Sequence, residues 1–240
     1  MNPQIEVLSD VPALVDRALE LVLEKLKSAI AERNIATIAL AGGSTPKPLY
    51  EKLAQQDLPW EKLHVFWGDE RYVPADHPDS NQRMARLAWL NHVPIPAENI
   101  HPMQMDAIDP TIAADRHEAE VKKFFNSKPG EFPAFDVILL GIGDDAHTAS
   151  LFPHTQALQV CDRLITVGNK DGNPRITFTV PLINAARTVI FMVAGSNKHH
   201  ALTQIFADQA DTDTYPARLI QPQGELWWLL DQSTNFSKEN

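Results

Sequence analysis

The sequence has little cysteine and no long hydrophobic run. Its 240 residues include a single cysteine, Cys161, which excludes an internal disulfide and a zinc site built from several cysteines. No apolar stretch is long enough to span a bilayer. The first residues, Met1 to Glu6, lack a basic segment followed by an apolar core, so we expect no signal peptide. These absences predict a soluble cytoplasmic protein with no membrane partner.

Basic residues are also scarce. Lys and Arg number 21 against 31 Asp and Glu, which gives a net charge of −10. Nucleic acids and anionic membranes bind surfaces on which Lys and Arg are concentrated. The charge balance therefore argues against a nucleic-acid partner. An anionic small substrate stays possible where local cations overcome the overall negative field.

The order of the apolar segments predicts an α/β fold. Apolar residues recur at steps of three and four over 11–30, which predicts a helix with Asp10 as its N-cap. Strands are expected at 36–41, 63–67, 135–140, 164–167, 176–180, 188–194 and 226–230, and further helices at 46–53, 84–90, 108–125 and 197–206. This alternation predicts one domain, residues 1–240, built on a doubly wound, mostly parallel sheet with helices on both faces.

The most informative segment follows the strand expected at 135–140. Residues 141–147 read Gly-Ile-Gly-Asp-Asp-Ala-His, and they would deliver Asp145 and His147 to the carboxyl end of that strand. Open α/β sheets bind ligands at this edge. A histidine beside a carboxylate can transfer protons near neutral pH. The alternative is a structural histidine, with Asp144 or Asp145 as the N-cap of a following helix.

A second cluster follows the strand expected at 36–41. Gly42, Gly43, Ser44 and Thr45 precede a short helix. Glycines allow a sharp turn with N–H groups pointing outward, hydroxyls add donors, and a helix N-terminus adds partial positive charge, so the segment is suited to a phosphate. It is neither a Walker loop nor a dinucleotide fingerprint. The alternative is an ordinary turn in which Ser44 or Thr45 caps the helix.

Three further segments supply charges. Asp69 and Arg71 follow the strand expected at 63–67, where they serve either a ligand site or a solvated loop. Arg175 begins a strand whose odd positions share one face. Lys198 lies in the first turn of a helix, an unfavourable place for a cation that a bound anion would improve. Read together, the clusters predict an anion site beside an acid/base site.

The order of these motifs is similar to that of a known family. It reads Gly-Gly-Ser-Thr-Pro at 42–46, Gly-Asp-Glu-Arg at 68–71, His-Pro-Asp-Ser-Asn at 77–81, Gly-x-Gly-x-Asp-x-His-Thr-Ala-Ser-Leu-Phe-Pro at 141–153, Arg-x-Thr at 175–177 and Gly-x-x-Lys at 195–198. Over residues 41–228 the chain resembles the 6-phosphogluconolactonases, whose relatives are glucosamine-6-phosphate deaminases and ribose-5-phosphate isomerases. One departure is Ala146, where the family usually has glycine.

The resemblance implies a fold of the sugar-phosphate isomerase/deaminase type and an activity. The activity is hydrolysis of 6-phospho-D-glucono-1,5-lactone to 6-phospho-D-gluconate in the oxidative pentose phosphate pathway, with no metal and no organic cofactor. His147, oriented by Asp145, resembles the general base, and Arg71 the cation near the lactone. The Gly43–Thr45 loop, Arg175 and Lys198 resemble a phosphate clamp. The chain is expected to be a monomer or a homodimer.

Two other functions fit some of these motifs. A glucosamine-6-phosphate deaminase would reuse the phosphate clamp with Asp69 as its base, but deaminases resemble Asp-Glu-Tyr in place of Gly-Asp-Glu-Arg and carry an acidic residue shortly after the histidine. A sugar-phosphate sensor would need a DNA-binding module, and no basic helix-turn-helix segment precedes the sheet. Ser150 lacks the Gly-x-Ser-x-Gly pattern, so we reject a serine esterase.

Overall fold

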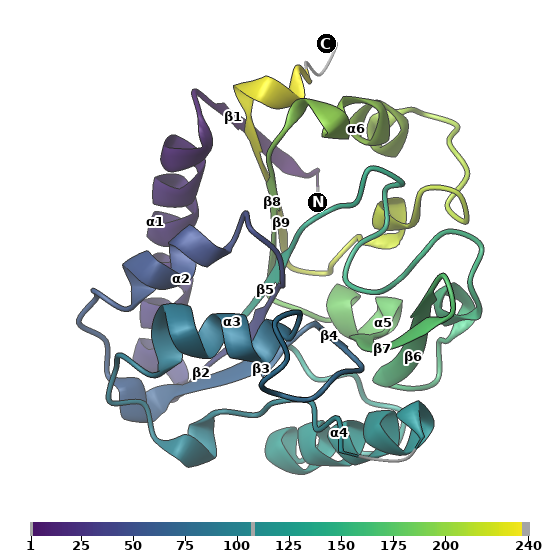
Figure 1. Cartoon of the computed structure of the whole chain (residues 1–240). Coiled ribbons are helices and arrows are strands. Elements are labelled where there is room, and N and C mark those ends of the chain that lie inside the picture. The colour runs from purple at the N-terminus through teal and green to yellow at the C-terminus, as the bar shows by residue number, and fades with distance from the viewer. Residues whose placement is uncertain (1, 107–108, 237–240) are drawn as a thin grey trace.

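Six parallel strands form the main sheet of the protein. The computed structural model describes residues 2–106 and 109–236, and in it the strands lie in the order β1-β9-β8-β5-β2-β3 (Figure 1). Their bounds are β1 Gln4–Leu8, β2 Ala36–Leu40, β3 Leu63–Trp67, β5 Val137–Leu140, β8 Thr188–Val193 and β9 Glu225–Asp231. The doubly wound, mostly parallel sheet expected from the sequence is confirmed.

Helices cover both faces of this sheet (Figure 1). One layer holds α1 (Val11–Arg33), α2 (Lys47–Leu53) and α3 (Asn81–Ala85), and the other holds α4 (Pro110–Phe125), α5 (Val180–Asn184) and α6 (His199–Phe206). Alternate strand residues point to opposite faces. On β2, Ile38 packs into the core beneath α1 and α2, whereas Ala39 packs into the core beneath α4 and α6. A strand buried on both faces explains the unbroken apolar run in the sequence.

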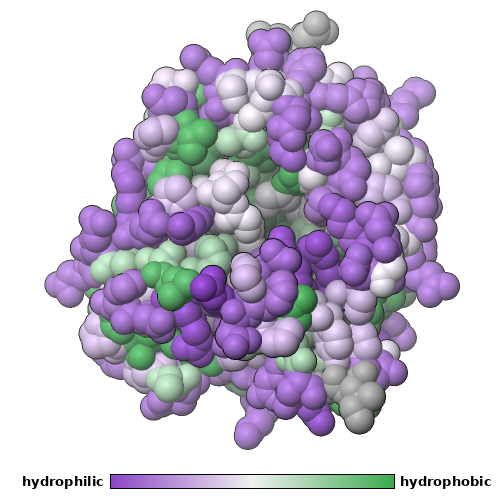
Figure 2. Space-filling view, in the orientation of Figure 1, coloured by the Kyte–Doolittle hydropathy of each residue, from purple (hydrophilic) through white to green (hydrophobic). Residues whose placement is uncertain are grey.

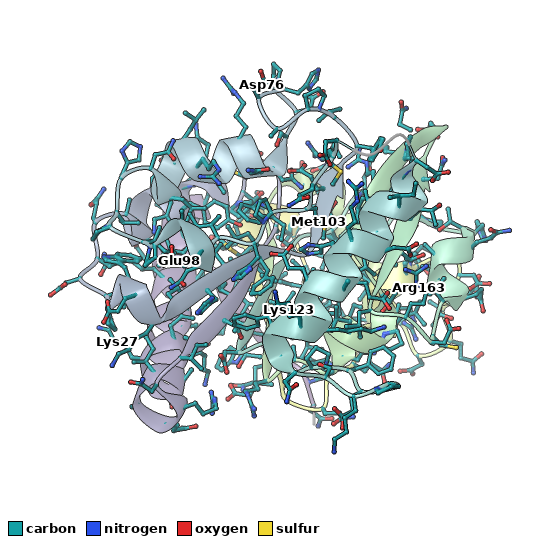
Figure 3. The ribbon with its side chains drawn as sticks, turned by 90° about the horizontal axis from the view of Figure 1, so that it is seen from below. Lys27, Asp76, Glu98, Met103, Lys123 and Arg163 are labelled. Atoms are coloured by element: carbon teal, nitrogen blue, oxygen red, sulfur yellow. The ribbon has the colours of Figure 1, made fainter. Side chains whose placement is uncertain are left out.

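The helix ends follow ordinary capping chemistry. Asp10 is the N-cap of α1, because its Oδ1 accepts a hydrogen bond of 2.9 Å from the N–H of Ala13. The fourth helix begins at Pro110, with Asp109 as its N-cap, while the expected start at Ile108 lies outside the described residues. Figure 3 shows Lys123 on α4 and Arg163 beside it. No helix in the described parts of the chain is long and apolar enough to cross a membrane.

A second sheet, which the sequence analysis did not separate, stands beside the main one. It is antiparallel, in the order β4-β7-β6, with bounds β4 Asp69–Arg71, β6 Ile165–Lys170 and β7 Asn173–Phe178. The expected strand at 176–180 ends early because Thr179 caps α5, its side chain accepting from the N–H of Leu182. Residues 69–71 were expected to serve a ligand site or a solvated loop, and no strand was predicted there. Asp69–Arg71 form β4 by pairing with β7, and three charged residues in a row carry no local pattern that predicts this.

The strand β1 was not predicted from the sequence either. Gln4–Leu8 lies at the edge of the main sheet and pairs with β9, with Ile5 opposite Trp228. Three of its five residues are half-buried and two are exposed, so its pattern is too polar for a buried strand. Its pairing partner, β9, lies at the other end of the chain, so no local sequence pattern predicts the strand.

The two sheets meet at Gly68. Its N–H donates to the carbonyl of Leu40 on β2 at 2.9 Å, and its carbonyl accepts from the N–H of Phe178 on β7 at 2.8 Å. The chain therefore leaves the main sheet and enters the small one within a single residue. This seam brings Asp69 and Arg71 to the carboxyl edge of the main sheet.

Candidate active site

A cleft of about 400 Å³ opens where the main sheet meets the small one. Its floor is the carboxyl ends of β2, β5 and β8, the place where strand order reverses in this sheet and where open α/β sheets bind ligands. Figure 2 shows the hollow near the middle of this face, with a mostly hydrophilic rim. Apart from Asp145, every residue predicted for the site lines the cleft: Gly42, Gly43, Ser44, Thr45, Asp69, Arg71, His147, Arg175 and Lys198.

Asp145 contacts the cleft through His147. The Nδ1 atom of His147 lies 2.5 Å from Oδ1 of Asp145, and the backbone N–H of His147 donates to the same oxygen at 3.1 Å. Burial opposes ionisation of Asp145, but the hydrogen bond and charge of His147 lower its pKa to about 2. An ionised carboxylate at this distance assigns the proton to Nδ1. The Nε2 atom then carries a free lone pair, as a general base requires.

A tight turn holds this pair in place. The N–H of Gly143 donates to the carbonyl of His147 at 2.9 Å, and the N–H of Ala146 donates to the carbonyl of Gly143 at 3.2 Å. Ala146 has a φ of 61°, the left-handed region that costs an L-residue roughly 1 kcal/mol. Alanine therefore occupies a position at which glycine would be relaxed. No helix begins directly after His147, which removes the capping alternative.

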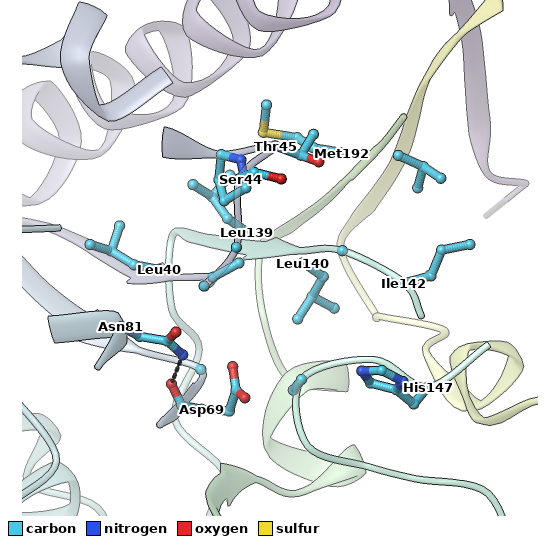
Figure 4. Close-up of a pocket in the computed structure, with 18 of the residues that line it drawn as sticks. Leu40, Ser44, Thr45, Asp69, Asn81, Leu139, Leu140, Ile142, His147 and Met192 are labelled. Carbon is cyan, nitrogen blue, oxygen red and sulfur yellow. Dashed lines mark hydrogen bonds between the residues drawn. The ribbon is translucent and has the colours of Figure 1, made fainter. Parts of the chain in front are cut away.

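The glycine loop lies on the opposite side of the cleft floor. Figure 4 shows Ser44 and Thr45 on one side of the end of β5 and His147 on the other. Gly43 has a φ of 101°, a conformation that favours glycine. The N-cap of α2 is Pro46, with no side-chain cap hydrogen bond, so neither hydroxyl plays the capping role considered from the sequence. Among the described residues, no hydrogen-bond partner engages these two hydroxyls, and they remain open to a ligand.

Three cations line the cleft without an ion-pair partner in the described parts of the chain. Arg71 and Arg175 stand directly opposite each other in the register of β4 and β7, and Lys198 closes a 3₁₀ turn before α6. Burial, and then the charge of Arg71, lower the pKa of Arg175 from its ordinary value. Two guanidinium groups side by side repel each other. In a chain of net charge −10, such a concentration of unpaired cations favours an anionic ligand.

The acidic residues beside these cations have separate roles. Asp69 faces the cleft, 6% exposed, and accepts a hydrogen bond of 2.7 Å from the hydroxyl of Ser150. Burial raises the pKa of Glu70, which accepts from the hydroxyl of Ser80 and from backbone N–H groups including that of Asn81. Glu70 therefore fixes the start of α3.

No group of three or more His, Cys, Asp or Glu side chains within the described residues is arranged to hold a metal ion.

Two residues of the site were not singled out from the sequence. Asn81 donates from Nδ2 to the carbonyl of Asp69 at 2.9 Å, the dashed line of Figure 4. The ring of Phe152 packs against that of His147, with centroids 4.4 Å apart, and the guanidinium of Arg175 lies 5.6 Å from its centre. Both residues belong to motifs quoted above, but a motif does not say which of its members supports another across the cleft.

Comparison with known proteins agrees with this geometry. The sequence matches the family described as glucosamine-6-phosphate isomerases/6-phosphogluconolactonase over residues 9–228. It is 66% identical to a 6-phosphogluconolactonase of Synechocystis sp., over 97% of each chain, and 66% identical to one of Nostoc sp., over 96% of each. The fold is similar to that of 6-phosphogluconolactonase from Trypanosoma cruzi, with a TM-score of 0.87 and 31% identity over 97% of this chain and 95% of that one. The chain therefore belongs to the glucosamine-6-phosphate isomerase/6-phosphogluconolactonase family.

Proposed function

We propose that this chain is a 6-phosphogluconolactonase, which hydrolyses 6-phospho-D-glucono-1,5-lactone to 6-phospho-D-gluconate. The observation that carries the proposal is the pairing of His147 with an ionised Asp145, 2.5 Å apart, in a cleft that also holds three cations with no ion-pair partner among the described residues. A base and an anion site are what hydrolysis of a phosphorylated lactone needs. The names of the relatives at 66% identity support the same activity.

The substrate is held by its phosphate. The open hydroxyls of Ser44 and Thr45 and the ammonium group of Lys198 line the cleft on the main-sheet side, and Arg175 completes the proposed clamp. Anchoring a remote dianion fixes the distance of the reacting carbonyl from the base, so binding energy is used for positioning. The proposed partner is thus a small phosphorylated sugar lactone, bound by one catalytic domain that comprises residues 1–240.

The chemistry needs one base and one cation. His147 Nε2 takes a proton from water, and the resulting hydroxide attacks C1 of the lactone. The carbonyl π electrons move onto the carbonyl oxygen, where the guanidinium of Arg71 stabilises the negative charge. The intermediate then collapses, the bond between C1 and the ring oxygen breaks, and the imidazolium returns its proton to the leaving oxygen. The new carboxylic acid loses its proton to solvent, which yields the carboxylate.

Deamination of glucosamine 6-phosphate is less compatible with the site. In that reaction Asp69 would be the base, and the histidine would be supported by an acidic residue shortly after it in the chain. Here the residues after His147 are Thr-Ala-Ser, and its carboxylate partner precedes it. The hydroxyl of Ser150 also occupies one oxygen of Asp69. A non-catalytic sensor would have no use for a histidine–carboxylate pair aimed into the cleft.

The test is the hydrolysis rate of freshly generated 6-phosphoglucono-δ-lactone, with a control lacking enzyme because the lactone opens spontaneously. Wild type is expected to accelerate the reaction, and His147→Ala to lower kcat by about 10²–10⁴-fold, the usual size of a general-base effect. Acceleration that survives in His147→Ala would transfer the role of base to Asp69. If wild type does not accelerate the reaction, ammonia release from glucosamine 6-phosphate is measured next.

A further inference from the structure

The hydroxyl of Tyr50 holds the chain at the entrance to the glycine loop. It accepts a hydrogen bond of 3.0 Å from the N–H of Ala41 and donates one of 2.7 Å to the carbonyl of the same residue. Ala41 directly follows β2 and directly precedes Gly42. One side chain therefore satisfies both backbone polar groups of the residue from which the loop departs.

Those backbone groups have no other partner among the described residues. The neighbouring carbonyl of Leu40 is still bonded to the sheet, through the N–H of Gly68 at 2.9 Å. Ala41 lies one residue further on, where the ladder between β2 and β3 has ended. The tyrosine hydroxyl thus extends the hydrogen bonding of the strand by one residue, into the segment that lines the cleft.

The tyrosine ring is itself rigidly held. Tyr50 and Trp89 are both fully buried, and their rings stack with centroids 6.1 Å apart and planes 23° apart. Trp89 belongs to the π-helical turn Arg86–Leu90 that continues α3, and α3 begins at Asn81. Burial raises the pKa of Tyr50, so its hydroxyl stays protonated and can donate.

Asn81 meets the loop from the other side. A Cβ atom added to Gly42 would lie 2.0 Å from Oδ1 of Asn81, so the amide is packed directly on the glycine backbone. The start of the loop is thereby enclosed between the tyrosine hydroxyl and the amide. Such a loop presents its N–H and hydroxyl groups in one arrangement before a ligand arrives, which reduces the entropy lost on binding.

We propose that Tyr50 is a positioning residue for the phosphate of the substrate, acting through Ala41 on the Gly42–Thr45 loop. It does not touch the ligand, since it is not among the residues that line the cleft. Its role is to keep the loop in the conformation that accepts the phosphate. The inference rests on the proposed function, because that function places a phosphate against this loop.

The experiment compares Tyr50→Phe with a matched control on the same strand. Thr37→Val removes a buried hydroxyl that also donates once and accepts once, at 3.0 Å each, but with Asp136 at the amino end of β2, away from the cleft. Steady-state kinetics with the lactone and direct calorimetric binding of inorganic phosphate are measured for both variants. The binding measurement needs no turnover, so it separates failure of this inference from failure of the proposed activity.

For Tyr50→Phe we expect KM for the lactone and the dissociation constant for phosphate each to rise about tenfold, with little change in kcat, because part of the loss of two hydrogen bonds appears in binding. Both constants should be unchanged in Thr37→Val, even if its melting temperature falls by as much as that of Tyr50→Phe. Unchanged constants in Tyr50→Phe, an equal rise in the two variants, or a fall in kcat alone would each overturn the inference.

A second variant guards against poor folding of Tyr50→Phe. Trp89→Phe keeps the tyrosine hydroxyl but leaves a smaller ring behind it, so we expect the same two constants to rise by a smaller factor. An unchanged phosphate dissociation constant in this variant would contradict the part assigned to Trp89. If Tyr50→Phe does not fold, an unchanged constant in Trp89→Phe would overturn the inference itself.

Discussion

The backbone of Gly143 lies directly against the side chain of His147. A Cβ atom added to Gly143 would come within 2.1 Å of Nδ1 of His147 and 2.3 Å of Oδ1 of Asp145. Real Cβ atoms do not make contacts this short. The pair can therefore keep its 2.5 Å separation only while this position has no side chain.

Gly143→Ala should separate the pair without unfolding the protein. We expect kcat to fall by about 10²-fold or more, the size of a general-base contribution, because the ring and the carboxylate must both move. Gly130→Ala is the control: Gly130 has a φ of 82° and open space around it, so alanine there adds only backbone strain, in a loop away from the cleft. Full activity of Gly143→Ala would mean that the contact between His147 and Asp145 is dispensable.

Removal of Lys198 should weaken binding rather than chemistry. A charge-assisted hydrogen bond to phosphate is worth roughly 1.5–3 kcal/mol, so Lys198→Ala should raise KM for the phosphorylated lactone by about 10- to 100-fold. Unphosphorylated glucono-δ-lactone should be affected far less. Lys47→Ala removes a lysine that is 53% exposed and pairs with Glu51, and it should leave KM unchanged. An equal loss with both lactones would exclude Lys198 as a phosphate ligand.

Replacement of Ala146 by glycine involves two opposed effects. Glycine would relieve the strain at φ 61°, about 1 kcal/mol, but would remove a fully buried methyl group, worth about 0.8 kcal/mol. We therefore expect Ala146→Gly to change the free energy of unfolding by less than about 1 kcal/mol and to leave kcat unchanged.

The control is Ala18→Gly, in which an equally buried methyl is lost from the middle of α1. In a helix, glycine is less favourable than alanine and the buried methyl is also lost, so the free energy of unfolding should fall by about 2 kcal/mol. Denaturant titration of the two variants measures the difference. An equal destabilisation of both would show that the turn at Ala146 carries no strain.

Stability should fall in mild acid because of a histidine beneath α4. Burial, with the charge of His101, lowers the pKa of His64 to about 4, whereas the unfolded chain takes up this proton near pH 6.5. The unfolded state therefore binds more protons between these values, so the stabilisation is complete above about pH 6.5 and is lost as the pH falls towards 4. His101 and His117 hold the pKa of Glu120 at about 2, against the effect of burial, so this carboxylate titrates below the range.

The measurement is the denaturant midpoint at pH 7 and pH 5. His64→Gln keeps an amide that can donate to or accept from Nε2 of His101, which lies 3.0 Å from Nδ1 of His64, but it does not titrate. The drop in midpoint should be smaller in this variant than in wild type. His92→Gln, which removes an exposed histidine, should keep the wild-type drop. An undiminished drop in His64→Gln would place the acid sensitivity elsewhere.

The parts of the fold that could be predicted have strong local patterns. The helix α1 repeats its apolar residues over several turns and has an N-cap at Asp10, while β3 is buried on most of its length. By contrast, β1 and β4 are short and polar, and each exists because of a partner far along the chain. Strand pairing over such separations is a tertiary property, which no window of sequence contains.

The same distinction holds for the site. Asp145 and His147 are two residues apart, so a glycine turn is enough to suggest their contact. The meeting of Arg71 with Arg175 depends on the register of β4 and β7, and the contact of Tyr50 with Ala41 depends on how α2 folds back over the end of β2. The motifs indicated which residues would gather at the cleft, but not which ones would hold the others in place.

The seam at Gly68 has a consequence for how the two walls of the cleft are held relative to each other. The glycine loop and Lys198 stand at the edge of the main sheet, whereas Arg71 and Arg175 stand on the small sheet, and Gly68 is hydrogen-bonded to both. The distance between the two walls is therefore set by how the two sheets are joined at Gly68. A change at Gly68 that shifts the small sheet would therefore move Arg71 and Arg175 together relative to the glycine loop, and would disturb the phosphate site and the reaction site at once.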